Sequence, residues 1–290
     1  MDNLRGATLM VLAMLAFAIE DMLIKLMATT LPVGQIIGML GFGSAVLLAP
    51  LLLVQGQPLL SRAMLTPAIA VRSVGELIGT LGFVTAIALI PLSTASAILQ
   101  ATPLYVTLGA ALFLGETVGW RRWMAIAVGL CGVLLIIRPG FEGFNWLSLF
   151  ALLGVVGLGT RDLATRRVPR ETSSLQLSFL AFLVLIPAAA ILMWSNGTAL
   201  APLTPPLWGY FTLALLIGIG AYYGIVAAMR VGEVSFVTPF RYSRILFALV
   251  IGTTIFGERP DTLTLLGAAI VVASGLYTLW RERNVRANTH

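Results

Sequence analysis

The chain reads LIPLS at residues 89–93 and FLGE at residues 113–116, at the two ends of an apolar run. A related arrangement returns later, with RVGEVS at residues 230–235 and IFGE at residues 255–258 around a second apolar run. Ser93 and Glu116 are matched by Ser235 and Glu258, and both matches have the same spacing along the chain. We therefore predict that the chain contains the same hydrophobic unit twice.

Residues outside this segment match at nearly the same spacing. Near the start of each unit, an aspartate is followed four residues later by a cation and then by a glutamine. The pairs are Asp21 with Asp162, Lys25 with Arg166, and Gln35 with Gln176. The small drift between the two spacings is what duplication followed by changes in loop length leaves behind.

The composition places the chain in a membrane. Hydrophobic residues make up 59% of it and charged residues only 10%, and the mean hydropathy is +0.98. A soluble domain carries roughly 25% charged residues, so this chain is too apolar to cover its surface in water. We expect an integral membrane protein whose partner is the lipid bilayer.

The apolar runs predict ten membrane spans, because one span needs roughly 20 apolar residues. Five fall in residues 1–142 and five in residues 143–290, and two repeats with an odd number of spans must be inverted in the bilayer. The predicted fold is an all-α integral membrane protein with ten transmembrane helices as two inverted five-helix repeats. The expected spans are Arg5–Met27, Val33–Val54, Pro67–Ile90, Ser93–Leu114, Arg121–Ile137, Trp146–Thr165, Ser174–Ser195, Trp208–Met229, Val234–Phe256 and Thr262–Trp280.

The net charge of +6 is distributed unevenly across these spans. With a cytoplasmic N-terminus, eleven arginines lie on the cytoplasmic side, and only Arg138, Arg259 and Lys25 lie toward the other side. Such a bias orients membrane proteins, so we expect both termini in the cytoplasm and the chain in the cytoplasmic (inner) membrane. The charge is therefore topological, and we expect no nucleic-acid partner.

Two other function classes fail on the residues that they require. An ATP-driven pump in one chain needs a glycine-rich phosphate loop with a lysine, whereas Lys25 is the only lysine and lies in an apolar span. Catalytic histidine pairs and histidine metal sites are also excluded, because the only histidine is the terminal His290. We expect no enzymatic function, no metal site and no cofactor.

Charged residues inside the spans, including Glu20 and Arg161, carry the most functional information, because a charge in hydrocarbon is costly unless it faces a cavity or a partner. Three pairs at i,i+4 spacing can form ion pairs along their own helices: Asp21 with Lys25, Arg72 with Glu76, and Asp162 with Arg166. The first and third pairs lie near opposite membrane edges. Each is a candidate gate, with a structural ion pair as the alternative.

Arg241 and Arg244 have no acid within four residues on their own span. Since a helix rises by about 1.5 Å per residue, Arg244 is expected near the membrane midplane, with Glu76 at a comparable depth. One interpretation is a structural bridge from Glu76 to Arg241 or Arg244, and the other is direct contact between these arginines and a substrate carboxylate.

Polar and aromatic residues of the same spans are candidates for the lining of a substrate cavity, with packing as the alternative for each. They are Thr80, Phe83, Gln100, Tyr105, Tyr222, Tyr223 and Phe240, beside the charged candidates Glu76, Arg241 and Arg244.

Two further features concern the helices themselves. Pro103 and Pro239 lie near span centres, where freed backbone carbonyls are tolerated only beside protein or a water-filled cavity. Glu116 and Glu258 fall just before the fifth and tenth spans, and we expect each to cap the helix that follows it.

The chain resembles the drug/metabolite transporter superfamily, specifically its ten-helix EamA-type carriers. The resemblance covers residues 5–280, through the duplicated five-helix unit, the Gly115-Glu116 and Gly257-Glu258 endings and the missing soluble domains. Among these carriers the chain looks most like the YddG-like exporters of amino acids, including aromatic ones. The resemblance implies a central cavity between the two halves and alternating access.

The sequence thus predicts a secondary transporter of small metabolites, with amino acids as the first substrate class. The alternatives are a carrier of other solutes, such as drugs or nucleotide sugars, a channel-like pore, and a membrane scaffold without transport. The sequence indicates no oligomeric state.

Overall fold

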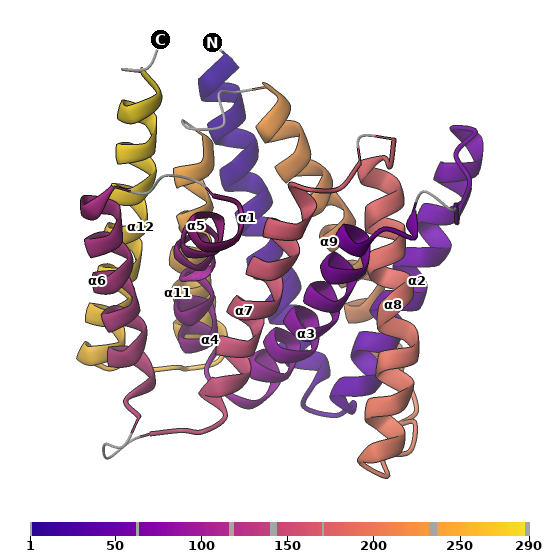
Figure 1. The fold of residues 1–290 in the computed structure, drawn as a ribbon. Coiled ribbons are helices and arrows are strands. Elements are labelled where there is room, and N and C mark those ends of the chain that lie inside the picture. The colour runs from indigo at the N-terminus through magenta and orange to yellow at the C-terminus, as the bar shows by residue number, and fades with distance from the viewer. Residues whose placement is uncertain are drawn as a thin grey trace.

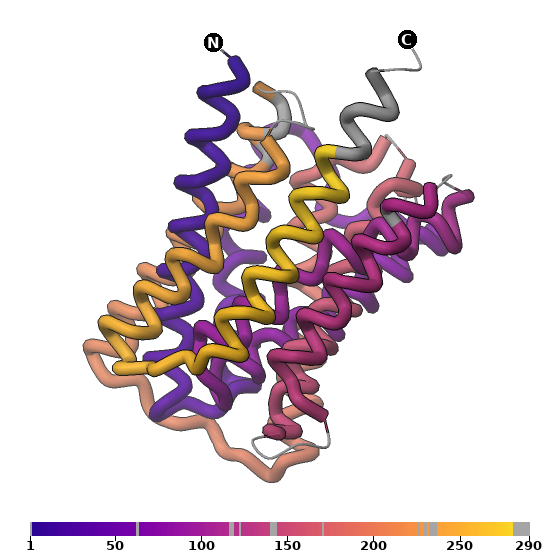
Figure 2. The backbone as a smooth tube through the Cα atoms, turned by 90° about the vertical axis from the view of Figure 1, so that its left-hand side faces the viewer, coloured from indigo at the N-terminus to yellow at the C-terminus, as the bar shows by residue number. Residues whose placement is uncertain are grey.

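The computed structural model describes residues 2–61, 64–115, 119–139, 144–169, 171–231 and 237–287. All regular elements in this part of the chain are helices, and it contains no strand. The helix α1 begins and the helix α12 ends at the same end of the bundle, which we name the terminal end (Figure 1). A view turned by 90° confirms this placement (Figure 2).

The helices follow the apolar runs of the sequence, and several ends carry standard caps. Thr66 accepts a hydrogen bond from the Ile69 amide at the start of α3, and Ser173 with Gln176 forms a capping box at the start of α8. The helices are α1 (Asp2–Met27), α2 (Val33–Val54), α3 (Pro67–Leu89), α4 (Leu92–Leu99), α5 (Thr102–Phe113), α6 (Trp120–Ile137), α7 (Ser148–Thr165), α8 (Ser174–Ser195), α9 (Pro205–Val231), the 3-10 turn η2 (Thr238–Tyr242), α11 (Ser243–Ile255) and α12 (Thr262–Ala287).

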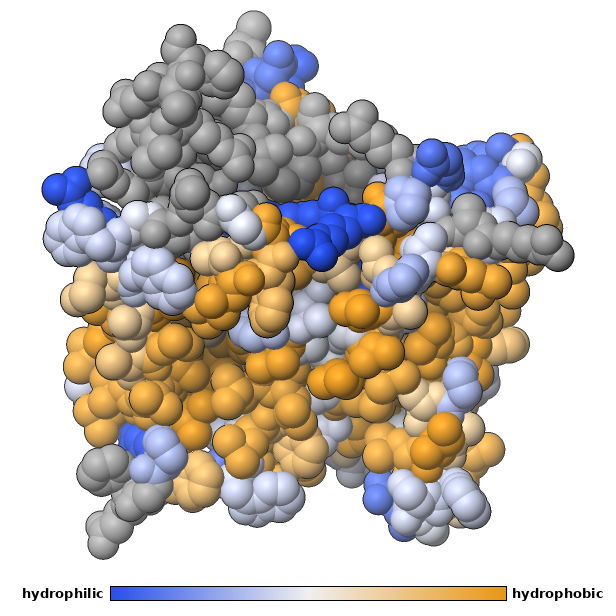
Figure 3. Space-filling model, viewed as in Figure 1, coloured by the Kyte–Doolittle hydropathy of each residue, from blue (hydrophilic) through white to orange (hydrophobic). Residues whose placement is uncertain are grey.

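Eight segments among the described residues are long and apolar enough to cross a membrane, with α4 and α5 counted as one. The apolar part of α6, Trp123–Ile137, is shorter. The expected span Val234–Phe256 begins outside the described residues and continues as η2 and α11. On the face seen in Figure 3, a broad apolar band crosses the middle of the molecule, and polar residues gather above and below it. The chain is therefore a multi-pass membrane protein.

Two of the expected spans depart from regular α-helix next to their prolines. The break between α4 and α5 lies at Gln100 and Ala101, just ahead of Pro103. Pro239 lies in the 3-10 turn η2, which leads directly into α11. Both breaks border the central cavity described below, which satisfies the requirement that freed carbonyls lie beside protein or a cavity.

The two halves are packed against each other in matched pairs of helices. The most extensive contacts join α3 to α7, α1 to α9, α2 to α8, and α6 to α12. In the predicted repeat, α1 corresponds to α7, α2 to α8, α3 to α9, and α6 to α12. Replacing each helix by its counterpart gives the same four pairs. In Figure 1, α1 runs away from the terminal end, whereas its counterpart α7 runs toward it.

The two matched glutamines make equivalent contacts across the halves. The Gln35 side chain donates to the Ala201 carbonyl at 2.9 Å and accepts from the Ala201 amide at 2.8 Å, in the loop before α9. The Gln176 side chain donates to the Pro58 carbonyl at 3.0 Å, in the loop before α3. Because α9 and α3 correspond to each other in the predicted repeat, each glutamine binds the loop that precedes the corresponding helix of the other half.

Glycines bring α3 and α7 into backbone contact. A Cβ atom added at Gly79 would lie 2.7 Å from the Leu158 nitrogen, and one at Gly157 would overlap the Gly79 backbone. Small residues at helix crossings allow this approach in membranes. The glycines of α9 differ, since Gly218 faces the Glu20 carboxylate and nothing lies within 4 Å of a Cβ at Gly220.

Candidate functional site

A cavity of about 700 Å³ lies between the two halves, within the size range of sites for small molecules. Four carboxylates and four guanidinium groups are among its described lining residues. They are Glu20, Asp21, Glu76, Asp162, Arg161, Arg166, Arg241 and Arg244. The formal charges of this set balance.

One wall carries an ion pair between α1 and α11. The Arg244 guanidinium donates to both oxygens of Asp21, at 2.7 to 3.1 Å. Arg244 also lies over the rings of Phe17 and Phe83, 5.0 and 5.3 Å from their centres. Asp21 is only 3% exposed. This pair is thus desolvated, bidentate and shared between the two halves.

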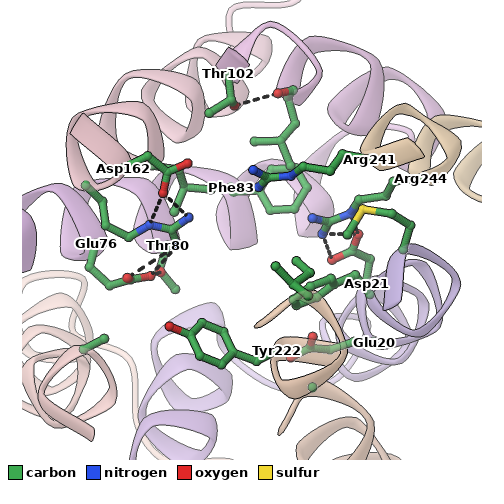
Figure 4. A pocket seen from close by; sticks show the side chains of 18 of the residues that line it. Glu20, Asp21, Glu76, Thr80, Phe83, Thr102, Asp162, Tyr222, Arg241 and Arg244 are labelled. Atoms are coloured by element: carbon green, nitrogen blue, oxygen red, sulfur yellow. Dashed lines mark hydrogen bonds and ion pairs between the residues drawn. The ribbon is translucent and has the colours of Figure 1, made fainter. Parts of the chain in front are cut away.

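The opposite wall carries a cluster of three charges on α3 and α7 (Figure 4). The Arg161 guanidinium lies 2.8 Å from an Asp162 oxygen and 3.3 Å from a Glu76 oxygen. The Thr80 hydroxyl also donates to Glu76, at 3.4 Å. One arginine therefore serves two carboxylates, and Arg166, one helical turn beyond Asp162, lines the same cavity.

Arg241 and Glu20 approach the cavity from the two remaining sides (Figure 4). Arg241 comes from η2, and Glu20 comes from α1, where the absence of a side chain at Gly218 leaves room for its carboxylate. Within the part of the chain that the structure describes, neither group forms an ion pair or a side-chain hydrogen bond. Tyr222 stands beside Glu20 on the same side.

Neutral residues complete the lining. Of the neutral candidates from the sequence, Thr80, Phe83, Gln100 and Tyr222 border the cavity. The Gln100 side chain donates to the Tyr242 carbonyl at 3.1 Å, across the two helix breaks. These two residues occupy equivalent positions of the two units, so the bond joins repeat-related sites.

The cavity ends before the molecular end opposite the termini, which we name the distal end. Its lining stops at Ile24, Ile37 and Ile87, each at most 4% exposed. Beyond them, Lys25 donates to the Ile87 and Ile90 carbonyls at 3.0 and 2.6 Å, at the C-terminal end of α3. A cation there satisfies carbonyls that lack helical partners.

Glu258 joins this closure from the second half. Its carboxylate accepts hydrogen bonds from the Leu92 and Ser93 amides, at 2.5 and 3.0 Å, and from the Ser93 hydroxyl at 2.6 Å. The Lys25 ammonium lies 3.8 Å away. We name Lys25, Glu258, Leu92 and Ser93 the distal closure. It links α1, the start of α4 and the loop before α12.

The expectation that Glu258 caps the following helix is therefore wrong. Glu258 caps α4 of the other half, and Asp261 caps α12 by accepting from the Thr264 amide at 2.8 Å. The reason is geometric, because α11 ends at Ile255 and the loop after it brings Glu258 to the amides at the start of α4. The matched Glu116 and Ser235 lie outside the described residues.

Several predicted ion pairs have other partners. Asp21 binds Arg244 and not Lys25, because Lys25 reaches the free carbonyls of α3. Arg72 donates to the Thr165 hydroxyl and the Leu177 carbonyl, and the proposed bridge from Glu76 to Arg244 is replaced by Glu76 with Arg161. Spacing along one helix identifies possible pairs but cannot weigh them against partners on facing helices. The Asp162 to Arg166 pair stays a prediction.

Three aromatic candidates lie away from the cavity lining. Tyr223 is 74% exposed on the outer surface of α9. Phe240 packs in an apolar cluster with Met10 and Met14. The Tyr105 hydroxyl bonds to the Thr160 hydroxyl at 3.0 Å and holds α5 against α7. The contacts of Phe240 and Tyr105 fit the packing interpretation.

Two further charged residues of the expected spans, Glu20 and Arg161, also line the cavity, although the sequence assigned neither a gate nor a binding role. Both directly precede a matched aspartate, so they occupy equivalent positions of the two units. The repeat therefore held the signal that could have marked them as a matched pair. No group of three potential metal ligands occurs among the described residues.

Comparison with known proteins assigns this architecture. The model of the EamA-like transporter family matches residues 4–138 and again residues 145–280. The pseudopaline exporter CntI of Pseudomonas aeruginosa is 31% identical over 93% of this chain and 94% of its own. The S-adenosylmethionine uptake transporter of Rickettsia prowazekii is 23% identical over 99% and 96% of the two chains.

Two further matches add detail. The riboflavin transporter of Rhizobium johnstonii is 29% identical over 65% of this chain, and the match spans 62% of that transporter. A solved crystal structure covers 96% of this chain and 98% of its own, with a TM-score of 0.59 and 18% identity, which shows the fold alone.

Proposed function

Because the chain belongs to the EamA-like transporter family, we propose that it is a secondary carrier that exports small metabolites by alternating access, with amino acids, including aromatic ones, as the first substrate class. In this proposal the protein resides in the cytoplasmic membrane with both termini inside, and its ten spans form two inverted five-helix repeats. The match to an exporter over 93% of the chain supports the direction.

The observation that carries the proposal is a central cavity that is closed at the distal end. It contains balanced charges at the interface of the halves, and its lining reaches Thr165 and Arg166 at the terminal end. The distal closure and the apolar residues inside it separate the cavity from the other end. We infer an inward-facing state of a carrier, in which release outward requires the distal closure to open.

The halves supply the parts that such a movement needs. Gln35 and Gln176 hold equivalent loops, and the matched helix pairs let one half rock against the other around the cavity. The breaks at Gln100 and at η2 provide points where helix direction can change without loss of long helical segments. Alternating access by inverted repeats uses this kind of architecture.

The test is counterflow in liposomes that contain the purified protein. Radiolabelled amino acids are added outside, with and without unlabelled amino acids inside, and with and without an imposed proton gradient. S-adenosylmethionine and riboflavin, named for the relatives, are tested in the same way. We expect saturable uptake that is stimulated by internal amino acid and absent from empty liposomes.

Each other outcome has a defined meaning. Flux that neither saturates nor shows counterflow would identify a pore and reject the carrier. Counterflow of another solute, with none for any amino acid, would reject the amino-acid class and retain the carrier.

A further inference from the structure

The charges that line the cavity are mostly neutralised by one another. Asp21 is neutralised by Arg244, and Arg161 lies between Glu76 and Asp162. Arg166 also has an interaction partner, so it is not counted among the free charges. Two lining charges stay without an ion-pair partner among the described residues, the Arg241 guanidinium and the Glu20 carboxylate.

Both groups are presented to the cavity by specific local structure. Arg241 stands on the 3-10 turn η2, which interrupts the helical run before α11 and directs the side chain inward. The Glu20 carboxylate lies against Gly218, where an added Cβ would come within 2.5 Å of its oxygen. Neither charge faces lipid, where it would be costly.

The two groups have opposite charge and enter from opposite sides of the cavity (Figure 4). A guanidinium group binds a carboxylate through two parallel hydrogen bonds. A carboxylate accepts hydrogen bonds from an ammonium group. The formal charges of the described lining residues sum to zero. A solute without net charge keeps this sum at zero, whereas a net cation or anion does not.

We propose that Arg241 and Glu20 form the two poles of a zwitterion site, in which Arg241 binds the carboxylate of the solute and Glu20 binds its amino cation. This inference rests on the carrier function proposed above and names the solute class. Phe83 and Tyr222 border the same space and supply apolar surface for the body of the solute.

Equilibrium binding to the detergent-purified protein tests this inference without requiring transport. The probes are the twenty amino acids, followed by phenylalanine, N-acetylphenylalanine and phenylalaninamide, which share one ring. The acetyl derivative lacks the cation and the amide lacks the carboxylate. We expect phenylalanine to bind at least about tenfold more tightly than either derivative, the scale of one lost charge-assisted hydrogen bond.

Two charge-removing variants assign the poles. Arg241→Gln should weaken phenylalanine and N-acetylphenylalanine at least about tenfold and leave phenylalaninamide unchanged. Glu20→Gln should weaken phenylalanine and phenylalaninamide and leave N-acetylphenylalanine unchanged. Arg121→Gln and Glu171→Gln, both at exposed positions outside the cavity, are the matched controls and should bind all three probes as the parent does.

A folding defect is separated from a binding defect by gel filtration and thermal melting of each variant. If Arg241→Gln does not fold, Arg241→Lys replaces it, because it keeps the charge and removes the two-point geometry. It should bind the carboxylate probes more weakly than the parent and leave phenylalaninamide unchanged.

Equal affinity for the three probes would overturn the inference, as would an equal loss for all three in either variant. Binding of none of the twenty amino acids would overturn it too. Failure here differs from failure of the carrier. Amino-acid binding without counterflow would reject the carrier and keep the site, whereas counterflow of another solute without amino-acid binding would do the reverse.

Discussion

The first half of the molecule carries Glu20-Asp21 where the second half carries Arg161-Asp162, at repeat-related positions. In the first half, Asp21 binds Arg244 from α11. In the second half, Asp162 binds the arginine that directly precedes it, and that arginine extends to Glu76. The two aspartates thus occupy matched positions in the sequence, while their partners differ together with the neighbouring residue.

This difference gives the cavity its asymmetry. The arginine of the second half joins the charge cluster of its own wall, whereas the glutamate at the equivalent place in the first half stays available to the cavity. A symmetric pair of walls would offer the same chemistry twice. The substitution of one charge for the other supplies a carboxylate pole opposite Arg241.

The largest expected effect comes from making the same change at the two matched aspartates. Asp21→Asn leaves the buried Arg244 without a counter-charge, which costs about 3–5 kcal/mol for a buried pair. Asp162→Asn leaves Arg161 paired with Glu76, so we expect a loss of about 1 kcal/mol or less. Thermal melting of the two purified variants measures the difference.

Equal loss of stability in these two variants would contradict the difference between the two aspartates, since it would mean that Glu76 does not compensate for Asp162. The double variant Asp162→Asn with Glu76→Gln extends the test. Removal of both acids should lower the stability about as much as Asp21→Asn does, because Arg161 then loses both of its partners.

A second test compares matched glycines at the helix crossings. Gly82 and Gly224 are equivalent positions of the two units, and they face the matched residues Gly154 and Ala13. A Cβ at Gly82 would lie 2.7 Å from the Phe150 carbonyl oxygen, whereas one at Gly224 would meet the Ala13 Cβ at 3.1 Å. Gly82→Ala should cost about 1–3 kcal/mol by overpacking, and Gly224→Ala should be nearly neutral.

The measurement is again melting of the two variants beside the parent. Similar melting temperatures of the two variants would show that α3 and α7 can separate as easily as α1 and α9. This result would contradict the closer packing of α3 on α7.

The smallest effect concerns an exposed ion pair that also joins the two halves. Hydrogen bonds from the Arg138 side chain and from Thr264 lower the pKa of Asp261 to about 2. Since an aspartate ordinarily has a pKa of about 3.9, the stabilisation is present above that pH and is lost as the pH falls toward 2. Asp261→Asn should cost about 1 kcal/mol or less at pH 7.

The difference in melting temperature between this variant and the parent should shrink as the pH is lowered from about 5. A difference that does not change with pH would assign the effect to the helix cap alone and not to the carboxylate charge.

Much of the fold could be predicted from sequence, because hydrophobic runs and prolines act locally. The positions of α2, α8 and the break near Pro103 follow from such signals. Among the charged candidates, Glu76, Arg241 and Arg244 do line one cavity. Their partners could not be predicted, because pairing depends on which helices face each other across the bundle.

The distal closure illustrates the same limit. Ser93 and Glu258 both belong to the repeated motif in the sequence. Their contact, however, joins the start of α4 in the first half to the loop after α11 in the second half. The repeat shows which residues of the two halves correspond to each other. It does not show which residues are in contact. Only the three-dimensional arrangement of the halves supplies that.

In the transport cycle proposed above, outward release of a solute requires the distal closure to open. The test is an electron-spin distance measurement in Cys131→Ser protein with nitroxides at Thr30 and Arg259, exposed positions beside the closure. We predict one short distance in the parent and an added longer distance in Glu258→Ala, which removes the acceptor shared by Leu92 and Ser93. A single unchanged distance in both proteins would contradict opening at this end.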